Sequence, residues 1–130
     1  NPYHPLVWIN GNPTIGKNTY IGGFSEINAK NGKIIIGNNC DIASFVSINI
    51  ADSHKRCIRL KNSIDYEDIL IGNNVFIGSH CAILGGAKIG HNSVVGAGTV
   101  VRKAEIPPYS LVIGDSIKSG YYRNQERAIN

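Results

Sequence analysis

Aliphatic side chains recur every six residues over most of this chain. The longest unbroken series has six members, and two earlier series have four and three. The thirteen anchors are Ile9, Ile15, Ile21, Ile27, Ile36, Ile42, Ile48, Ile71, Ile77, Ile83, Ile89, Val95 and Val101. A step of six matches neither an α-helix, with its period of 3.6, nor an alternating strand, with its period of 2. It predicts a chain that runs straight for a few residues, turns by about 120° and repeats.

Three such hexads make one triangular coil, and successive coils stack as parallel strands about 4.8 Å apart. The residue after an anchor is usually small, and the fourth residue after it is usually small or β-branched. Cys40 and Cys81 occupy that fourth position, so we expect both to be buried as small core side chains. The sequence therefore predicts an all-β fold, a parallel β-helix of about four coils that forms a single domain over residues 1–130.

The six-residue step is interrupted at two places. Three extra residues lie between Ile27 and Ile36, around an Asn31-Gly32 turn signal. A gap of 23 residues separates Ile48 from Ile71, and we expect residues 53–68 to leave the coil as a charged loop. Pro107-Pro108 is expected to end the regular structure, followed by a tail over residues 116–130 that forms a short helix or a closing arm.

Composition excludes several classes of protein. No apolar run approaches the roughly 20 residues that span a bilayer, and no secretory signal is evident, so we expect a cytoplasmic protein. Three widely spaced cysteines argue against a disulfide framework or a zinc site. The net charge of +4 is modest, and the sequence lacks the stripe of basic residues that is typical of a nucleic-acid binder. Basic residues near the C-terminal half suit a small polyanion such as a nucleotide phosphate: Arg102, Lys103, Lys118, Arg123 and Arg127.

Residues 71–108 read IGNNVFIGSHCAILGGAKIGHNSVVGAGTVVRKAEIPP, and residues 36–55 read IGNNCDIASFVSINIADSHK. Both stretches resemble the galactoside and maltose O-acetyltransferases and the related xenobiotic and nucleotide-sugar acetyltransferases of the hexapeptide-repeat group. The resemblance implies a left-handed β-helix, a hand that is rare among parallel strands in general. It also implies a homotrimer with acetyl-CoA held in clefts between subunits as the acyl donor, and no metal.

The resemblance also implies roles for individual residues. His54, at the start of the loop, takes the position of the general base. Ser79 and Ala97, with the adjoining Gly78 and Gly96, take positions that contact the thioester and the pantetheine arm. The expected contacts of the rest of acetyl-CoA are Arg102, Lys103 and Lys118, and Phe76 lies where relatives often place a Trp near the acceptor.

Three positions depart from the family motif. Arg102 stands where the family has Thr, and Gly85 stands where it has Pro. Asp115-Ser116 replaces an Asn-Pro pair near the expected adenine end of CoA. These departures mark the places where ligand contacts should differ from those of the relatives.

Acyl transfer needs a group that removes a proton from the acceptor, and histidine suits this role because its ordinary pKa lies near neutral pH. Among the four histidines, His4 and His91 are expected on the surface, and His80 follows Ser79 at a corner. His54 is the preferred base. Asn49, Asp52 and Asp41 are candidates to orient it or to bind the acceptor.

The sequence predicts an acetyl-CoA-dependent acetyltransferase acting on the amine of a nucleotide-linked amino sugar for cell-surface glycan synthesis. O-acetylation of a sugar hydroxyl is an alternative, because the same histidine serves either nucleophile. A non-catalytic assembly module is a second alternative. A zinc-dependent carbonic anhydrase on the same fold is disfavoured, because His80 and His91 do not fall at stacking positions.

Overall fold

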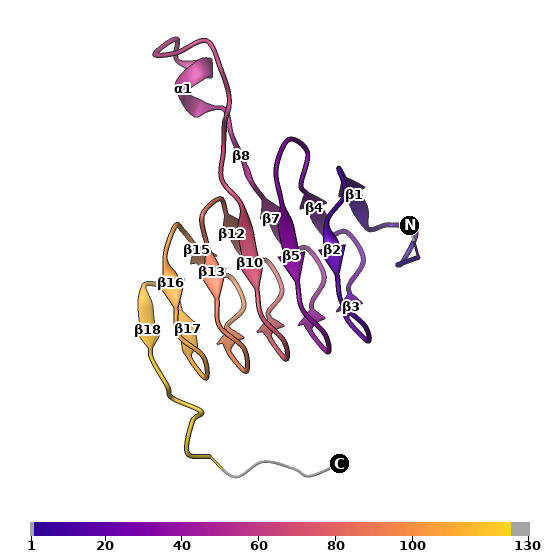
Figure 1. Ribbon diagram of the computed structural model, residues 1–130, viewed down its shortest axis with the longest axis vertical. Coiled ribbons are helices and arrows are strands. Elements are labelled where there is room, and N and C mark those ends of the chain that lie inside the picture. Colours follow the sequence, from indigo (N-terminus) through magenta and orange to yellow (C-terminus); the bar gives the residue numbers. More distant parts are fainter. Residues whose placement is uncertain (1, 126–130) are drawn as a thin grey trace.

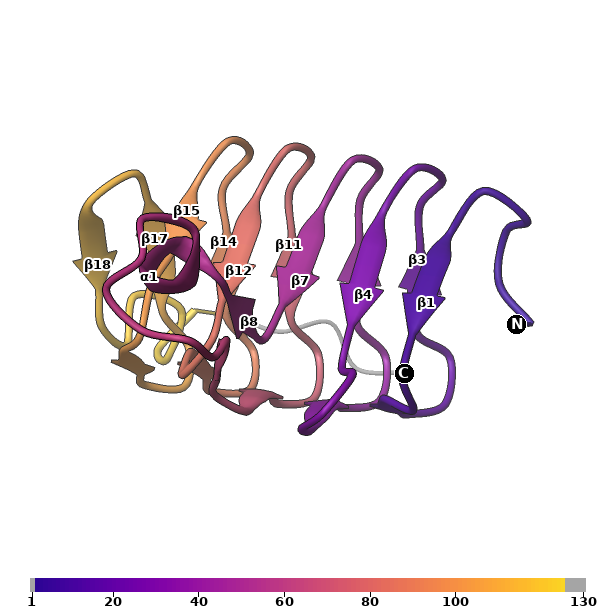
Figure 2. The same ribbon diagram turned by 90° about the horizontal axis from the view of Figure 1, so that it is seen from above.

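The computed structural model describes residues 2–125, and three parallel sheets form the faces of a triangular coil (Figure 1). Sheet A contains β1 (Trp8–Asn10), β4 (Glu26–Asn28), β7 (Ser47–Asn49), β12 (Ala82–Leu84) and β15 (Val100–Val101). Sheet B contains β2 (Thr14–Ile15), β5 (Ile34–Ile36), β10 (Ile69–Ile71), β13 (Lys88–Ile89) and β16 (Glu105–Ile106). Sheet C contains β3 (Tyr20–Ile21), β6 (Asp41–Ile42), β11 (Phe76–Ile77), β14 (Val94–Val95), β17 (Leu111–Ile113) and β18 (Ser116–Lys118). The chain visits A, B and C in turn, so the coils lie in a row (Figure 2). The predicted parallel β-helix is confirmed.

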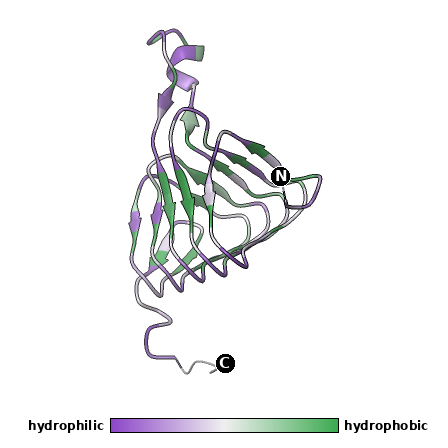
Figure 3. Cartoon of the chain, turned by 45° about the vertical axis from the view of Figure 1, so that its right-hand side comes forward, coloured by the Kyte–Doolittle hydropathy of each residue, from purple (hydrophilic) through white to green (hydrophobic). Residues whose placement is uncertain are grey.

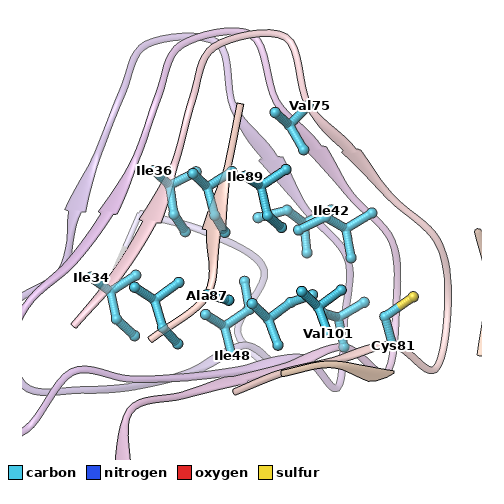
Figure 4. Close-up of a cluster of buried hydrophobic side chains, with 14 of the residues drawn as sticks. Ile34, Ile36, Ile42, Ile48, Val75, Cys81, Ala87, Ile89 and Val101 are labelled. Carbon is cyan, nitrogen blue, oxygen red and sulfur yellow. The ribbon is translucent and has the colours of Figure 1, made fainter. Parts of the chain in front are cut away.

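The hexad anchors point into the coil and stack on one another (Figure 4). Ile27, Ile48 and Ile83 are register partners along sheet A, and all three are fully buried. Every predicted anchor is buried except Ile9 and Ile15 of the first coil, which are partly exposed and pack against the core. The anchors therefore form one continuous hydrophobic core.

The small residues at the fourth position are also buried, and they link neighbouring coils. Ser25 Oγ donates a hydrogen bond to the Ala43 carbonyl of the next coil at 2.8 Å. Cys40 and Cys81 are 2% exposed, and each thiol approaches a carbonyl of the next coil at 3.1 Å. Both cysteines are thus the buried core side chains that the repeat predicted.

The β-helix has five coils, one more than the number of about four that the repeat predicts. The step shortens to five residues between Val101 and Ile106, and the prolines that follow do not end the fold. Residue 107 directly follows β16, the last strand of sheet B. In each earlier coil, the residue at the equivalent position donates its backbone N–H to a carbonyl of the next coil. In the last coil no acceptor lies above, so Pro107, without an N–H, loses no hydrogen bond there. Val112 then provides a further buried anchor.

The predicted tail begins with a closing arm. β18 turns back and pairs antiparallel with β17. This pairing covers the edge of β17, the strand that the last coil contributes to sheet C. Residues 126–130, including the basic residue Arg127, lie outside the described residues. The one helix in residues 2–125 is α1 (His54–Cys57), and no helix in this range is long and apolar enough to cross a membrane.

Candidate functional site

All the insertions in the coil emerge at one corner, where sheet A passes into sheet B. We call it corner AB, and it comprises residues 11–13, 29–33, 50–68, 85–87 and 102–104. The longest insertion rises from the body as a two-stranded ribbon of β8 (Ala51–Asp52) and β9 (Asp65–Tyr66), with α1 above it (Figure 1). This loop is mostly hydrophilic, in contrast to the strands of the coil (Figure 3).

The shorter insertion at residues 29–33 supports the base of this loop. The Asn31 side chain donates a hydrogen bond to the Tyr66 hydroxyl at 3.1 Å, and the Lys33 backbone N–H donates to the Asp68 carboxylate at 2.8 Å. A Cβ on Gly32 would lie 2.6 Å from the end of the Ile50 side chain, so a larger residue here would require that side chain to move. The two interruptions that the sequence reveals separately therefore form one structural unit.

His54 is the first residue of α1 and is paired with Asp52 in β8. The Asp52 carboxylate lies 2.5 Å from His54 Nδ1 and also accepts the His54 backbone N–H at 3.0 Å. The backbone N–H of His54, followed by its side chain, lowers the pKa of Asp52 below its ordinary value. An ionised carboxylate accepts a hydrogen bond from Nδ1–H, which leaves Nε2 as the free acceptor. The arrangement suits a proton acceptor, and the His54 side chain is 62% exposed and accessible.

A pocket of about 630 Å³ lies beneath the loop and includes His54 in its wall. Its lining combines residues of both legs of the loop with residues of the coil at corner AB. The charged members are Asp52, Lys55, Asp65, Glu67, Arg102 and Lys103. Arg102 and Lys103, which the sequence assigned to the donor, therefore lie in the same pocket as the candidate base.

A pair of glycines brings the loop close to the coil. A Cβ on Gly85 would lie 3.0 Å from the Ile50 carbonyl, and a Cβ on Gly86 would lie 2.7 Å from the Glu67 carboxylate. Gly86 also has a φ of +89°, which favours glycine. Across these glycines the Lys103 ammonium forms an ion pair with Glu67 at 3.0 Å. Sequence reasoning missed Glu67, whose only signal was its place in a charged loop.

The positions expected to contact the acyl end of the donor lie at another corner, where sheet C passes into sheet A. Gly78 and Ser79 lie beside Gly96 and Ala97 of the next coil, and a Cβ on Gly78 would lie 2.5 Å from the Ala97 nitrogen. Within one chain, therefore, the four residues come together with one another but not with His54 on corner AB.

His80 is held by its neighbours at this second corner. Ser79 Oγ donates to the Ser44 carbonyl at 3.0 Å, so it accepts from His80 Nδ1–H at 2.9 Å. The His80 ring stacks on Phe45 with centroids 5.0 Å apart, and Phe45 stacks on Phe24 at 5.1 Å. His80 is therefore part of a stack of three aromatic rings on the surface, one from each of three successive coils.

The remaining predicted site residues are dispersed. Phe76 in β11 is 40% exposed on sheet C, and Asp41 in β6 is exposed on the same sheet. Lys118 in β18 places its ammonium 5.7 Å from the centre of the Tyr121 ring. Asn49 ends β7, and its side-chain oxygen accepts hydrogen bonds from the Ala51 backbone and the Asn28 side chain. Asn49 therefore supports the start of the loop, because both contacts are within the protein.

Residues 2–125 contain no group of three or more His, Cys, Asp or Glu side chains placed to hold a metal ion. Cys57 is exposed in α1, and burial raises the pKa of the Cys40 and Cys81 thiols. The candidate site therefore consists of His54 with Asp52, the charged pocket below them, and the separate Gly78–Ala97 corner.

Comparison with known proteins identifies the repeat. Residues 68–103 match the bacterial transferase hexapeptide model, described as six repeats, and residues 14–49 match the hexapeptide repeat of succinyl-transferase. The chain therefore carries hexapeptide repeats of the kind found in bacterial transferases.

The chain is also similar to galactoside acetyltransferases. It is 40% identical over 101 residues to the galactoside O-acetyltransferase of Escherichia coli, covering 77% of this chain and 49% of that enzyme. A structure of galactoside acetyltransferase in complex with coenzyme A superposes with a TM-score of 0.78 at 32% identity, covering 97% of this chain and 65% of that one. The N-acyltransferase AntD of Bacillus cereus has a TM-score of 0.76 at 19% identity over 91% of this chain and 68% of its own, and shows the fold alone. The chain spans about half the length or less of the curated relatives it matches.

Proposed function

We propose that this protein transfers an acetyl group from acetyl-CoA to a sugar acceptor, with His54 as the general base. The observation that carries the proposal is the Asp52–His54 pair, which leaves Nε2 free at the edge of a pocket. The galactoside acetyltransferase that it resembles was solved with coenzyme A bound, which supports this choice of donor.

His54 Nε2 would accept the proton as the amine or hydroxyl of the acceptor attacks the thioester carbonyl. The tetrahedral intermediate then collapses, the carbon–sulfur bond breaks, and the protonated His54 returns its proton to the leaving CoA sulfur. Asp52 stabilises the transient imidazolium because its carboxylate stays ionised beside Nδ1. A backbone N–H at the Gly78–Ser79 corner is our candidate for stabilising the carbonyl oxygen as it becomes negative.

The complete site requires more than one copy of the chain. His54 and the Ser79–Ala97 positions lie on different corners of the coil, so one chain does not present both to the same thioester. A homotrimer of the kind found in related acetyltransferases would bring corner AB of one copy to the second corner of its neighbour. We therefore propose three sites between subunits, with Gly78, Ser79, Gly96, Ala97, Lys103 and Lys118 contacting acetyl-CoA and Phe76 lying near the acceptor.

The acceptor that we favour is the amine of a nucleotide-linked amino sugar. A charged pocket with several cations beside His54 suits a substrate that carries phosphate. O-acetylation of a sugar hydroxyl uses the same residues and is the second candidate, supported by the similarity to galactoside O-acetyltransferase.

The proposal is tested by measuring release of free CoA from acetyl-CoA with a panel of acceptors. The panel contains nucleotide-linked amino sugars, the corresponding free amino sugars, and neutral sugars that have only hydroxyl groups. We expect CoA release with at least one sugar and a product that is heavier by one acetyl group. If the protein does not bind CoA in calorimetry, the proposal fails and a non-catalytic assembly module becomes the better explanation.

A further inference from the structure

Arg102 lies at corner AB directly after β15, in the wall of the pocket that also includes His54. Lys103, the next residue, lines the same pocket. The two residues therefore bring two neighbouring cations to the wall beside His54.

Most of the other charged side chains around Arg102 have a partner. Lys103 pairs with Glu67 and Lys61 pairs with Asp65, while the Asp52 carboxylate is held by the His54 ring. Within residues 2–125, no carboxylate lies in ion-pair range of Arg102 or of Lys55, the other cation that lines the pocket. These two side chains thus supply positive charge to the pocket that is held in no ion pair.

A guanidinium group presents a rigid planar fork of N–H donors that matches the oxygens of phosphate or carboxylate. Such a group remains charged at any working pH. An unpaired arginine in a pocket is therefore suited to an oxyanion. The question is whether that anion belongs to the donor or to the acceptor.

Position favours the acceptor. In acetyl-CoA the whole pantetheine arm separates the phosphates from the thioester. Arg102 shares one pocket of about 630 Å³ with His54, the group that must reach the reacting atom. An anion bound there lies near the nucleophile, as a phosphate or carboxylate of the acceptor would. The Lys103 ammonium in the same pocket is already held by Glu67, so it is not one of the two unpaired cations.

We infer that Arg102, with Lys55, binds an anionic group of the acceptor and selects acceptors that carry phosphate or carboxylate. The inference rests on the proposed acetyltransferase function and adds a substrate class to it. Arg102 is then a specificity-determining residue, and its role differs from the donor contact expected from the family motif. A nucleoside diphosphate and a sugar acid are the two sources of such an oxyanion.

The test is a binding titration that does not depend on turnover. Wild-type protein and the Arg102→Thr variant, which restores the family residue, are saturated with CoA so that the donor site is filled. Each is then titrated by calorimetry with uridine diphosphate, thymidine diphosphate, glucuronate and, as an uncharged control, glucose. The exposed Lys17, on another corner, provides the charge-matched control variant Lys17→Thr.

We expect Arg102→Thr to weaken binding of either the nucleoside diphosphates or glucuronate by about tenfold to a hundredfold, as loss of charge-assisted hydrogen bonds does. The probe whose binding weakens identifies the source of the oxyanion. Affinity for CoA, measured separately, should stay within about twofold of wild type, and Lys17→Thr should bind all probes normally. The Arg102→Lys variant should recover only part of the loss, because lysine lacks the planar fork.

Two results would overturn the inference. Unchanged affinity for every anionic probe would show that Arg102 does not contact an acceptor. If the Arg102→Thr variant instead loses affinity for CoA, Arg102 would be assigned to the donor phosphates. Failure of the proposed function is distinguishable from both, because wild-type protein would then not bind CoA at all.

Discussion

The Asp52 carboxylate lies 2.5 Å from Nδ1 of His54, two residues further along the chain, and this contact leaves Nε2 as the free ring nitrogen. The same carboxylate accepts the His54 backbone N–H, so it fixes both the ring and the first turn of α1. The geometry orients a histidine that is otherwise exposed to solvent. It also makes separate predictions for the two residues.

Replacing His54 with alanine should lower kcat by about 10²- to 10⁴-fold, because the acceptor loses its proton acceptor. The affinity for CoA should change by less than about twofold, since no donor contact is removed. Steady-state kinetics and calorimetry provide the two measurements. His91→Ala, at a different corner, is the matched control and should keep normal turnover. A His54→Ala enzyme with near-normal kcat would refute the assignment.

Replacing Asp52 with asparagine retains the size of the side chain and removes its charge. We expect kcat to fall at least tenfold, because the imidazolium formed during transfer loses its counter-ion. The KM for acetyl-CoA should be little affected. If Asp52 instead binds the acceptor, the KM for the acceptor will rise while kcat is maintained, and the orienting role would be wrong.

Lys61 lowers the pKa of Asp65 through a side-chain hydrogen bond in the same loop. A carboxylate with a lowered pKa adds stability above its ordinary pKa of about 3.9, and that contribution is lost as the pH falls through the lowered value. Lys61→Met should therefore move the Asp65 titration midpoint upward, as measured by carbon NMR of the carboxyl groups. Asp52 is the internal control, and its midpoint should not move, because its pKa is lowered mainly by His54.

Gly86 and Gly98 both have positive φ angles, of +89° and +72°, but differ in their surroundings. Alanine at either position should lower the free energy of unfolding by about 1–2 kcal/mol from backbone strain. Gly86→Ala should cost more, because its Cβ would meet Glu67 and Lys103, whereas nothing lies within 4 Å of Gly98. Denaturant unfolding of both variants measures the difference. Equal losses would show that the Glu67–Lys103 pair moves aside without cost.

The three cysteines should differ in reactivity. Cys57 is exposed, whereas Cys40 and Cys81 are buried and burial raises the pKa of their thiols. Only the thiolate reacts with disulfide reagents. A thiol assay at pH 8 should therefore find one fast group per chain in the native protein and three after denaturation. Cys57→Ser should abolish the fast phase, and a second fast group in native protein would contradict the packing described for the core.

The hexad alone was enough to predict the three-faced coil, because each anchor meets the same environment as the anchor one turn away. It also located the loop, since a break in a strict period is visible without a structure. It failed at the last coil, where the step between Val101 and Ile106 is five residues and two prolines follow. Prolines stop a strand only where an N–H is required, and the open end of sheet B requires none.

The composition of the pocket lay beyond sequence reasoning. Glu67 and Lys103 are 36 positions apart, and their contact depends on Gly85 and Gly86 allowing the loop to lie against the coil. Likewise, Arg102 was grouped with the donor contacts because it adjoins Lys103 in the motif. Only the folded chain places it in one pocket with His54.

The sequence by itself determined the repeat, the core and the position of His54 at the break in the repeat. These features depend on local spacing and on burial that recurs in every coil. The tertiary structure decided which of the insertions in the repeat lie next to one another. Insertions separated by many residues emerge at the same corner because each coil returns the chain to the same face. Some charges that the sequence leaves scattered, such as Glu67 and Lys103, are thereby paired, whereas the pocket cations Arg102 and Lys55 lie in no ion pair within residues 2–125.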